Sequence, residues 1–327
     1  MFINKEEKIF VAGHKGMVGS SICRKLKKYD YKNILTVSRE NVDLTKKENV
    51  NKWFKENTPD IVILAAAKVG GITANNNSPY EFLMDNINIQ NNVIESAWKY
   101  QSKRLLFLGS SCIYPKHSKQ PIIEESLMTG ELESTNESYA LAKILGIRLC
   151  NSLRIQYGFD AISLMPTNLY GPGDNYHPLN SHVLPSMIRR FHAAKTKNLE
   201  QVVCWGTGNP FREFLHVDDL AEACIFALNS WDPEREDAPK LKGGKLLTYL
   251  NVGTGVDIRI KDLAKKISDL INYKGTIKWD DSKPDGTPKK QLDISRINKL
   301  GWKPSIDLDI GLKETIRNYE KKYQKLQ

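Results

Sequence analysis

The sequence predicts an α/β protein, built as a Rossmann-like, doubly wound parallel sheet followed by a smaller α/β domain. Two observations support this fold class. Short apolar segments rich in β-branched residues alternate with helical segments through the first half of the chain, as they do in proteins with parallel sheets. A glycine-rich turn at 13–19, GHKGMVG, separates the first such segment from the first helix, and dinucleotide-binding βαβ units begin in this way.

The elements of the first half follow in a regular order. We expect strands at 8–12, 33–37, 60–64, 104–108 and 161–165, and helices at 17–28, 46–55, 78–100 and 138–157. The third strand, DIVIL, is apolar almost throughout, as a strand buried on both faces of a sheet is. Because strands joined by helices run parallel, their carboxyl ends meet at one edge of the sheet, where ligands bind in this architecture.

The second half is less regular. Clusters of Gly, Pro, Asn and Asp predict turns at 170–174, 205–210, 242–244 and 284–288, and between them we expect helices at 183–195, 217–229, 260–271 and 308–323. We assign residues 1–168 to the Rossmann domain and residues 169–327 to the smaller, substrate-binding domain. Segments near 202–256 are expected to return to the Rossmann domain.

Composition excludes several classes of protein. With 40% hydrophobic and 26% charged residues among 327, the chain is typical of a globular protein rather than a disordered or fibrous one. The longest apolar run, 61–67, is far shorter than the roughly 20 residues that span a bilayer. The acidic start of the chain resembles no targeting peptide, so we expect a cytoplasmic protein without a membrane partner.

Net charge and cysteine content indicate which kinds of ligand to expect. The net charge of +10 rests mostly on lysines scattered singly and in pairs, whereas readers of nucleic acids favour arginine. We therefore expect a phosphate-bearing small ligand and no nucleic acid. The five cysteines are odd in number and lack metal-binding spacing, so we expect neither a disulfide framework nor a metal site.

The three glycines of the first turn have distinct expected roles. Gly13 allows the tight turn, Gly16 lets the backbone approach a pyrophosphate, and Gly19 lets the helix pack close to the sheet. The N–H groups at the N-terminus of the helix would then face the phosphates. A glycine-rich turn without a ligand is the alternative.

The end of the second strand indicates which dinucleotide binds. NAD sites commonly place an acidic residue there, to bind the ribose 2′-hydroxyl. Here the strand leads to Arg39, and no acid occurs before Glu40. Because Arg39 and Lys15 can instead meet a 2′-phosphate, we favour NADP over NAD. The alternative is that Arg39 is an exposed loop charge.

Two further motifs carry catalytic chemistry. Tyr139 and Lys143 are four residues apart on an expected helix and therefore share one face, where the ammonium should lower the pKa of the phenol. The segment LGSSC at 108–112 stands at the end of the fourth strand, where a serine can donate a hydrogen bond to a substrate carbonyl oxygen. The alternatives are a chance spacing and a turn of small residues.

These motifs, in this order, resemble the extended short-chain dehydrogenase/reductase superfamily. Within it, the chain is similar to the epimerase/reductases that convert GDP-4-keto-6-deoxy-D-mannose to GDP-L-fucose with NADPH. The resemblance runs from about residue 9 to the last helix, through the segments AGHKGMVGS, LAAAKVGGI, FLGSSCIYPK, MPTNLYGPGDN, NSHVLP, REFLHVDD, NVGTGVD and KPDGTP. It implies that residues 1–168 bind NADP(H), that residues 169–327 bind the GDP-sugar, and that the protein forms a homodimer.

The resemblance also implies roles for individual residues. Ser110, Tyr139 and Lys143 would form the reductase triad, with Cys112 as the base and His182 as the acid of epimerisation. NADP would be held by Gly13, His14, Lys15, Gly16, Met17, Val18, Gly19, Arg39, Leu108, Gly109, Ser110, Ser111, Lys143, Pro166, Thr167, Asn168, Leu169 and His182. The GDP-sugar would be held by Arg190, Trp205, Arg212 and Asp285, together with His182, and no metal is implied.

The chemistry of these residue types agrees with such roles. A 4-keto sugar carries acidic C–H bonds at C3 and C5, and inverting either centre takes a base, an acid and a donor to the enolate oxygen. Cys112 lies two residues after Ser110 in the chain, so its thiol would face the same pocket, and it can be tuned to ionise near neutral pH. His182 titrates in the range needed to return a proton. Taken alone, Cys112 is typical of a core thiol and His182 of a residue at a helix N-terminus.

Other functions stay open. A close one is C4 reduction, with or without epimerisation, of a related GDP-4-keto sugar such as a 6-deoxy-heptose, which would keep the triad. An NAD-dependent nucleotide-sugar 4-epimerase would need neither Cys112 nor His182, and Arg39 disfavours it. A non-catalytic NADP-sensing protein on the same fold would not need the Tyr139–Lys143 pair.

Overall fold

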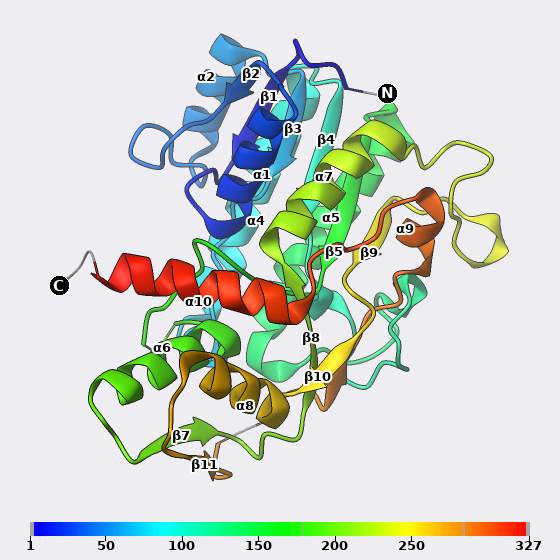
Figure 1. Ribbon diagram of the computed structural model, residues 1–327. Helices are drawn as coiled ribbons and strands as arrows, with labels where there is room; N and C mark the ends of the chain where they lie inside the picture. Colours follow the sequence, from blue (N-terminus) through cyan, green and yellow to red (C-terminus); the bar gives the residue numbers. More distant parts are fainter. Residues whose placement is uncertain (1–2, 179, 284, 325–327) are drawn as a thin grey trace.

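The computed structural model describes residues 3–178, 180–283 and 285–324 (Figure 1). Within these residues, the larger lobe is centred on a sheet of six strands in the order β2, β1, β3, β4, β5, β9, and all neighbouring strands are parallel. The strands span Asn33–Leu35 (β2), Lys8–Ala12 (β1), Ile61–Leu64 (β3), Arg104–Leu108 (β4), Ala161–Pro166 (β5) and Tyr249–Val252 (β9). The chain winds outward from β1 in both directions, so the doubly wound sheet that the sequence predicts is confirmed.

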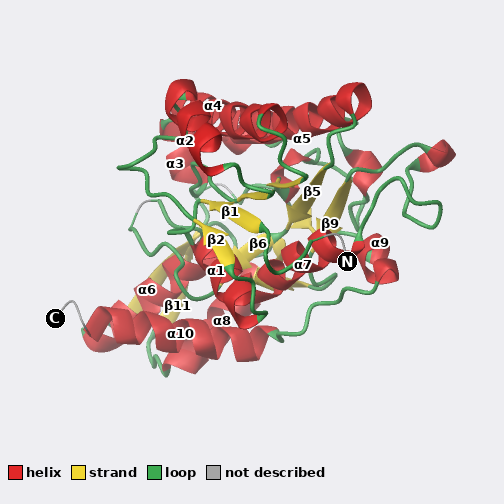
Figure 2. Ribbon diagram, turned by 90° about the horizontal axis from the view of Figure 1, so that it is seen from above, coloured by secondary structure: helices red, strands yellow, loops and turns green. Residues whose placement is uncertain are grey.

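Helices cover both faces of this sheet (Figure 2). On one face, α4 (Pro79–Lys99) packs along α5 (Glu137–Tyr157), with α2 (Lys47–Asn57) and α3 (Ile72–Asn77) beside α4, and on the other α1 (Met17–Lys28) packs along α7 (Val217–Ser230). Every residue of β3, β4 and β5 is buried, because the helices exclude water from both faces. Across the described ranges, none of the helices has both the length and the apolar character that crossing a membrane requires.

The smaller lobe lies below the central sheet in Figure 1 and has its own hydrophobic core. Strand β8 (Phe211–His216) pairs with β10 (Asp257–Arg259), β12 (Lys289–Lys290) and β6 (Asn168–Tyr170), and β7 (Gln201–Trp205) pairs with β11 (Thr276–Asp280). Its helices are α6 (Val183–Thr196), α8 (Ile260–Ile271) and α10 (Leu308–Gln324), and α9 (Ser295–Leu300) packs against β9. Four short 3₁₀ turns occur in the described residues, η1 (Ser111–Ile113), η2 (Glu124–Ser126), η3 (Ser134–Asn136) and η4 (Lys242–Gly244).

Some predicted bounds differ from the structure. Strand β2 ends at Leu35, two residues before its predicted end, because its pairing with β1 stops at Phe10↔Leu35. The short helices α3 and α9 were not predicted. Helix α7 and strand β9 lie in the larger lobe, whereas β7 and β8 lie in the smaller one. The division at residue 168, with a return near 202–256, stays a proposal.

A buried carboxylate, that of Glu213 in the REFLHVDD segment, joins three parts of the chain. Its Oε1 accepts hydrogen bonds from the N–H groups of Thr254 (2.6 Å) and Gly255 (2.7 Å), just after β9. Its Oε2 accepts one from the N–H of Leu292 (2.7 Å), two residues beyond β12. Glu213 therefore holds the segments next to β10 and β12, two of the strands that pair with β8, and with them the wall of the site described below.

We expect Glu213→Ala to lower the free energy of unfolding by about 2–3 kcal/mol, because it leaves the buried N–H of Leu292 and the part-buried N–H groups of Thr254 and Gly255 without their acceptor. Urea unfolding followed by circular dichroism measures this loss, with Glu236→Ala at an exposed loop position as the control. A loss below about 1 kcal/mol would mean that water or a shifted backbone satisfies these donors.

Candidate active site

The predicted catalytic residues meet at the carboxyl end of β4. This strand ends at Leu108, and the chain turns into η1 at Ser110, whose Oγ accepts a hydrogen bond from the N–H of Cys112 (3.2 Å). Helix α5 begins at Glu137, so Tyr139 lies in its first turn, packed beside η1. The Ser110 hydroxyl lies within hydrogen-bonding reach of both the Tyr139 phenol and the Cys112 thiol. The structure therefore brings the serine, the thiol and the phenol together.

Two donors point at the Cys112 thiol. Asn136 Nδ2 lies 3.4 Å and Lys290 Nζ lies 3.5 Å from Cys112 Sγ. Burial raises the pKa of Cys112, but the positive charge of Lys290, hydrogen bonds from Ser110 and Lys290, and the charge of Arg212 outweigh it, so the pKa falls below its ordinary value. These surroundings therefore favour the thiolate, unlike those of a thiol packed in a core.

Tyr139 and Lys143 share a face of α5 as expected, but the predicted effect of Lys143 on the phenol is wrong for this structure. Lys143 Nζ donates to the Leu108 carbonyl oxygen (2.8 Å) and lies 5.8 Å from the centre of the Tyr139 ring. Burial lowers the pKa of Lys143 to about 7, which weakens its charge. Burial and the charge on Cys112 raise the pKa of Tyr139, and the Ser110 hydrogen bond offsets this only in part. Tyr139 is therefore a phenol at neutral pH, in the state that donates a proton.

His182, the predicted acid, is the N-cap residue of α6. The loop after β3 holds this segment, since the Gly71 N–H donates to the Asn180 carbonyl oxygen (3.2 Å). The imidazole reaches solvent yet is surrounded by protein atoms, and this desolvation, together with the charge of Lys290, lowers the pKa of His182. The charge of Lys290 thus lowers the pKa of both His182 and Cys112.

The glycine turn has the close packing expected of a dinucleotide site. Gly13 has φ +89°, and a Cβ there would lie 2.7 Å from the Ala66 backbone nitrogen. A Cβ on Gly19 would lie 2.2 Å from the Gly13 carbonyl oxygen, so α1 packs directly on the turn. Helix α1 begins after Gly16 with no side-chain cap and no acidic residue in its first turn, so no carboxylate competes with a phosphate there.

The other predicted cofactor residues lie at the same edge of the sheet. Leu108 ends β4 and Gly109 to Ser111 follow it. Pro166 ends β5, Thr167 precedes β6, and Asn168 and Leu169 are the first two residues of β6. The Thr167 hydroxyl and the Asn168 amide both donate to the Glu213 carbonyl oxygen, at 3.2 and 2.8 Å. The predicted 2′-phosphate residues are exposed, and Lys15 forms an ion pair with Glu40 (3.3 Å).

The four predicted substrate residues form two pairs in the smaller lobe. Arg190 lies over the half-exposed Trp205 ring, 5.4 Å from its centre, and donates to the Val203 carbonyl oxygen (2.6 Å). Arg212 Nη2 lies 3.3 Å from the Asp285 carbonyl oxygen. The Asp285 carboxylate accepts from the backbone and hydroxyl of Thr207 (2.8 and 2.7 Å), so it orders a loop instead of standing free.

Sequence reasoning missed Lys290 and Asn136, the two side chains that donate to the thiol. Asn136 stands three residues before Tyr139, so its nearness to that motif was a usable signal. Lys290 had none, because β12 is two residues long and its pairing with β8 leaves no pattern in the sequence.

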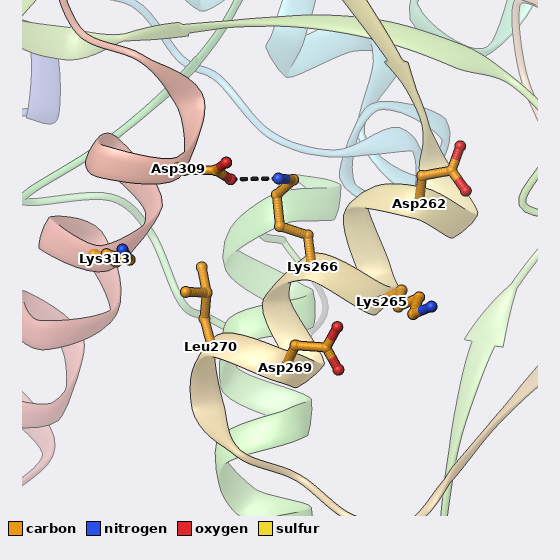
Figure 3. Close-up of a pocket in the computed structure, with 7 residues that line it drawn as sticks. All are labelled: Asp262, Lys265, Lys266, Asp269, Leu270, Asp309 and Lys313. Atoms are coloured by element: carbon orange, nitrogen blue, oxygen red, sulfur yellow. Dashed lines mark hydrogen bonds and ion pairs between the residues drawn. The ribbon is translucent and has the colours of Figure 1, made fainter.

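A shallow pocket of about 440 Å³ between α8 and α10 lies apart from this site (Figure 3). It is lined by Asp262, Lys265, Lys266, Asp269, Leu270, Asp309 and Lys313. Lys266 forms an ion pair with Asp309 across it. Because none of the predicted site residues lines it, we treat it as a charged surface between two helices.

A doubly wound sheet with a glycine turn after its first strand, and a serine, tyrosine and lysine at the end of β4, define a nucleotide-dependent oxidoreductase or epimerase. The chain belongs to the NAD dependent epimerase/dehydratase family, whose model matches residues 9–238. The predicted resemblance to the extended short-chain dehydrogenase/reductases is thereby confirmed.

Individual relatives cover almost the whole chain. It is 51% identical to GDP-L-fucose synthase 1 of Arabidopsis thaliana, over 97% of this chain and 94% of that protein. It is 49% identical to GDP-L-fucose synthase of Escherichia coli (strain K12), over 95% and 96%. Among solved structures, MlghC, a GDP-mannoheptose C4 reductase from Campylobacter jejuni with NADP bound, matches with a TM-score of 0.87 and 35% identity, over 97% of this chain and 99% of that one.

Proposed function

We propose that the protein converts GDP-4-keto-6-deoxy-D-mannose to GDP-L-fucose, by epimerisation at C3 and C5 and NADPH-dependent reduction at C4. The observation that carries this is the joint placement of Cys112, with its lowered pKa, beside Ser110 and Tyr139. A base that forms the enolate, Cys112, and the groups that assist reduction, Ser110 and Tyr139, can thus act on the same ketone. The GDP-L-fucose synthases with about half of their residues in common with this chain support the same substrate.

The residues divide the work in a consistent way. Ser110 and Tyr139 would donate to the C4 oxygen and so stabilise the enolate, while Cys112 removes an α-proton and His182 returns one on the other face. Bound NADPH supplies the hydride for C4. Tyr139 would then give its proton to the C4 oxygen, and Lys143, which donates to the Leu108 carbonyl oxygen at the end of β4, would bind the ribose.

One incubation tests both activities. The protein is mixed with NADPH and GDP-4-keto-6-deoxy-D-mannose in D₂O, and the product is examined by NMR. GDP-L-fucose with deuterium at C3 and C5 is expected. Reduction without deuterium would leave a plain 4-reductase. No NADPH consumption would contradict the proposal and direct the assay to a GDP-4-keto-heptose, since a GDP-mannoheptose reductase has the same fold.

Arg39→Ala should weaken NADPH binding by about 10–100-fold and change NADH binding by less than about twofold. A guanidinium bonded to a phosphate contributes roughly 1.5–3 kcal/mol, and only NADPH carries the 2′-phosphate. Fluorescence titration of both cofactors measures the two affinities. Arg235→Ala, at a distant exposed arginine, is the control. Equal weakening of both cofactors would mean that Arg39 does not contact the 2′-phosphate.

We also infer that the protein acts as a cytoplasmic homodimer. Support for the dimer comes from α5, where Leu141, Leu145 and Ile155 lie along one outward face and are 47%, 42% and 73% exposed. Such an apolar stripe, beside the neighbouring helix α4, is suited to pairing with a second copy (Figure 2). We propose the cytoplasm because the relatives that this chain resembles, such as GDP-L-fucose synthase of Escherichia coli (strain K12), are biosynthetic enzymes.

A further inference from the structure

The short strand β12 brings the Lys290 ammonium to the Cys112 thiol, in addition to the Arg212 guanidinium on β8. Strand β12 runs parallel to β8, with Lys290 opposite Arg212. Residues opposite each other on paired strands direct their side chains to the same face of the sheet. Lys290 and Arg212 therefore approach Cys112 from one side, and Lys290 Nζ reaches within 3.5 Å of Sγ.

The charge of Lys290 is not neutralised by a carboxylate. Among the residues that the structure describes, none of the acidic side chains lies within ion-pair distance of Lys290 Nζ. Its neighbour Lys289, on the opposite face of β12, instead pairs with Asp257 (3.2 Å) and lies 5.8 Å from the centre of the Phe211 ring. Lys290 is thus the cation of this strand that is available to an anion at Cys112.

The surroundings of the thiol are otherwise neutral or positive. From the facing elements, Cys112 meets Lys290 on β12, Arg212 on β8 and the phenol of Tyr139 on α5. The remaining contacts are the neutral donors Ser110 and Asn136. This setting stabilises a negative charge on sulfur, and an opposite charge at such a distance commonly lowers a pKa by about 1–3 units.

We propose that Lys290 is a positioning residue that holds Cys112 as a thiolate before substrate arrives. Its consequence for catalysis rests on the proposed function. The thiolate forms a new S–H bond with the α-proton, the electrons of the broken C–H bond pass to the C4 oxygen as an enolate, and Lys290 keeps its own proton throughout. Protonation of the opposite face of the carbon by His182 then completes inversion.

The thiolate is tested without any substrate. The rate of alkylation of Cys112 by iodoacetamide, resolved by mass spectrometry of its peptide, is measured against pH for the full-length protein. Wild type should titrate below the range of an ordinary thiol. Lys290→Met should raise this midpoint by at least one unit, which slows alkylation at pH 7 about tenfold. Lys289→Met, which removes a charge one residue away, should leave the midpoint unchanged.

Deuterium exchange adds the catalytic readout. Lys290→Met should exchange substrate protons about tenfold more slowly at pH 7 and recover as the pH rises, whereas Lys290→Arg should keep most of the wild-type profile. An unchanged alkylation midpoint in Lys290→Met overturns the inference. If that variant does not fold, a wild-type midpoint at or above that of a free thiol overturns it. If wild type neither exchanges nor reduces the sugar, the proposed function fails while the alkylation profiles still decide the role of Lys290.

Discussion

Replacement of Tyr139 by phenylalanine is expected to lower NADPH oxidation by about 10²–10⁴-fold, the usual contribution of a positioned general acid. Ser110 alone would then remain to donate to the C4 oxygen. The high pKa of the phenol keeps its proton in place at neutral pH, so in wild type the proton is transferred only as the hydride arrives. The rate at which the NADPH absorbance at 340 nm falls after addition of the keto sugar measures the loss.

Binding separates this loss from a damaged fold. Tyr139 lies in the first turn of α5, away from the glycine turn at 13–19, so the variant should bind NADPH with nearly wild-type affinity. Tyr157→Phe, at the last residue of the same helix, is the matched control and should oxidise NADPH normally. Retained turnover in Tyr139→Phe would assign the proton to another donor, with Ser110 the nearest.

Much of this arrangement was predictable, because it depends on local patterns. The alternation of strands and helices places residues 13–19, 108–112 and 166–169 at one edge of a parallel sheet, whatever the details of packing. The four-residue spacing of Tyr139 and Lys143 fixes their common helix face. Periodicity and chain order were therefore enough to gather most of the candidate site.

What could not be predicted depends on contacts between distant segments. Lys290 meets Cys112 across 178 residues, and Glu213 holds Leu292 across 79. Neither contact produces a periodic pattern in the sequence from which it could be predicted. The pKa values also escaped prediction, because the direction of the shift at Tyr139 depends on burial and on the charge at Cys112 rather than on helix spacing. The fold is set by pattern, while the ionisation of the site is set by what surrounds each group.

Substitution of Cys112 by serine should abolish deuterium exchange at C3 and C5, with a loss of about 10²–10⁴-fold. A serine hydroxyl keeps the shape of the side chain and its contacts with Asn136 and Lys290, but it holds its proton far too tightly to act as a base near pH 7. The cation beside position 112 cannot make up this difference, since such a pair shifts a pKa by only about 1–3 units.

The reductase groups are untouched by this change, so Cys112→Ser should still reduce the unepimerised 4-ketone slowly through Tyr139 and Lys143. NMR in D₂O distinguishes the two products by their configuration and deuterium content. Cys23→Ser is the matched control, because Cys23 lies half-buried on α1 with a pKa that burial raises, and it should exchange normally. Normal exchange in Cys112→Ser would place the base elsewhere, and His182 would then be the group to replace next, since the charge of Lys290 lowers its pKa as it lowers that of Cys112.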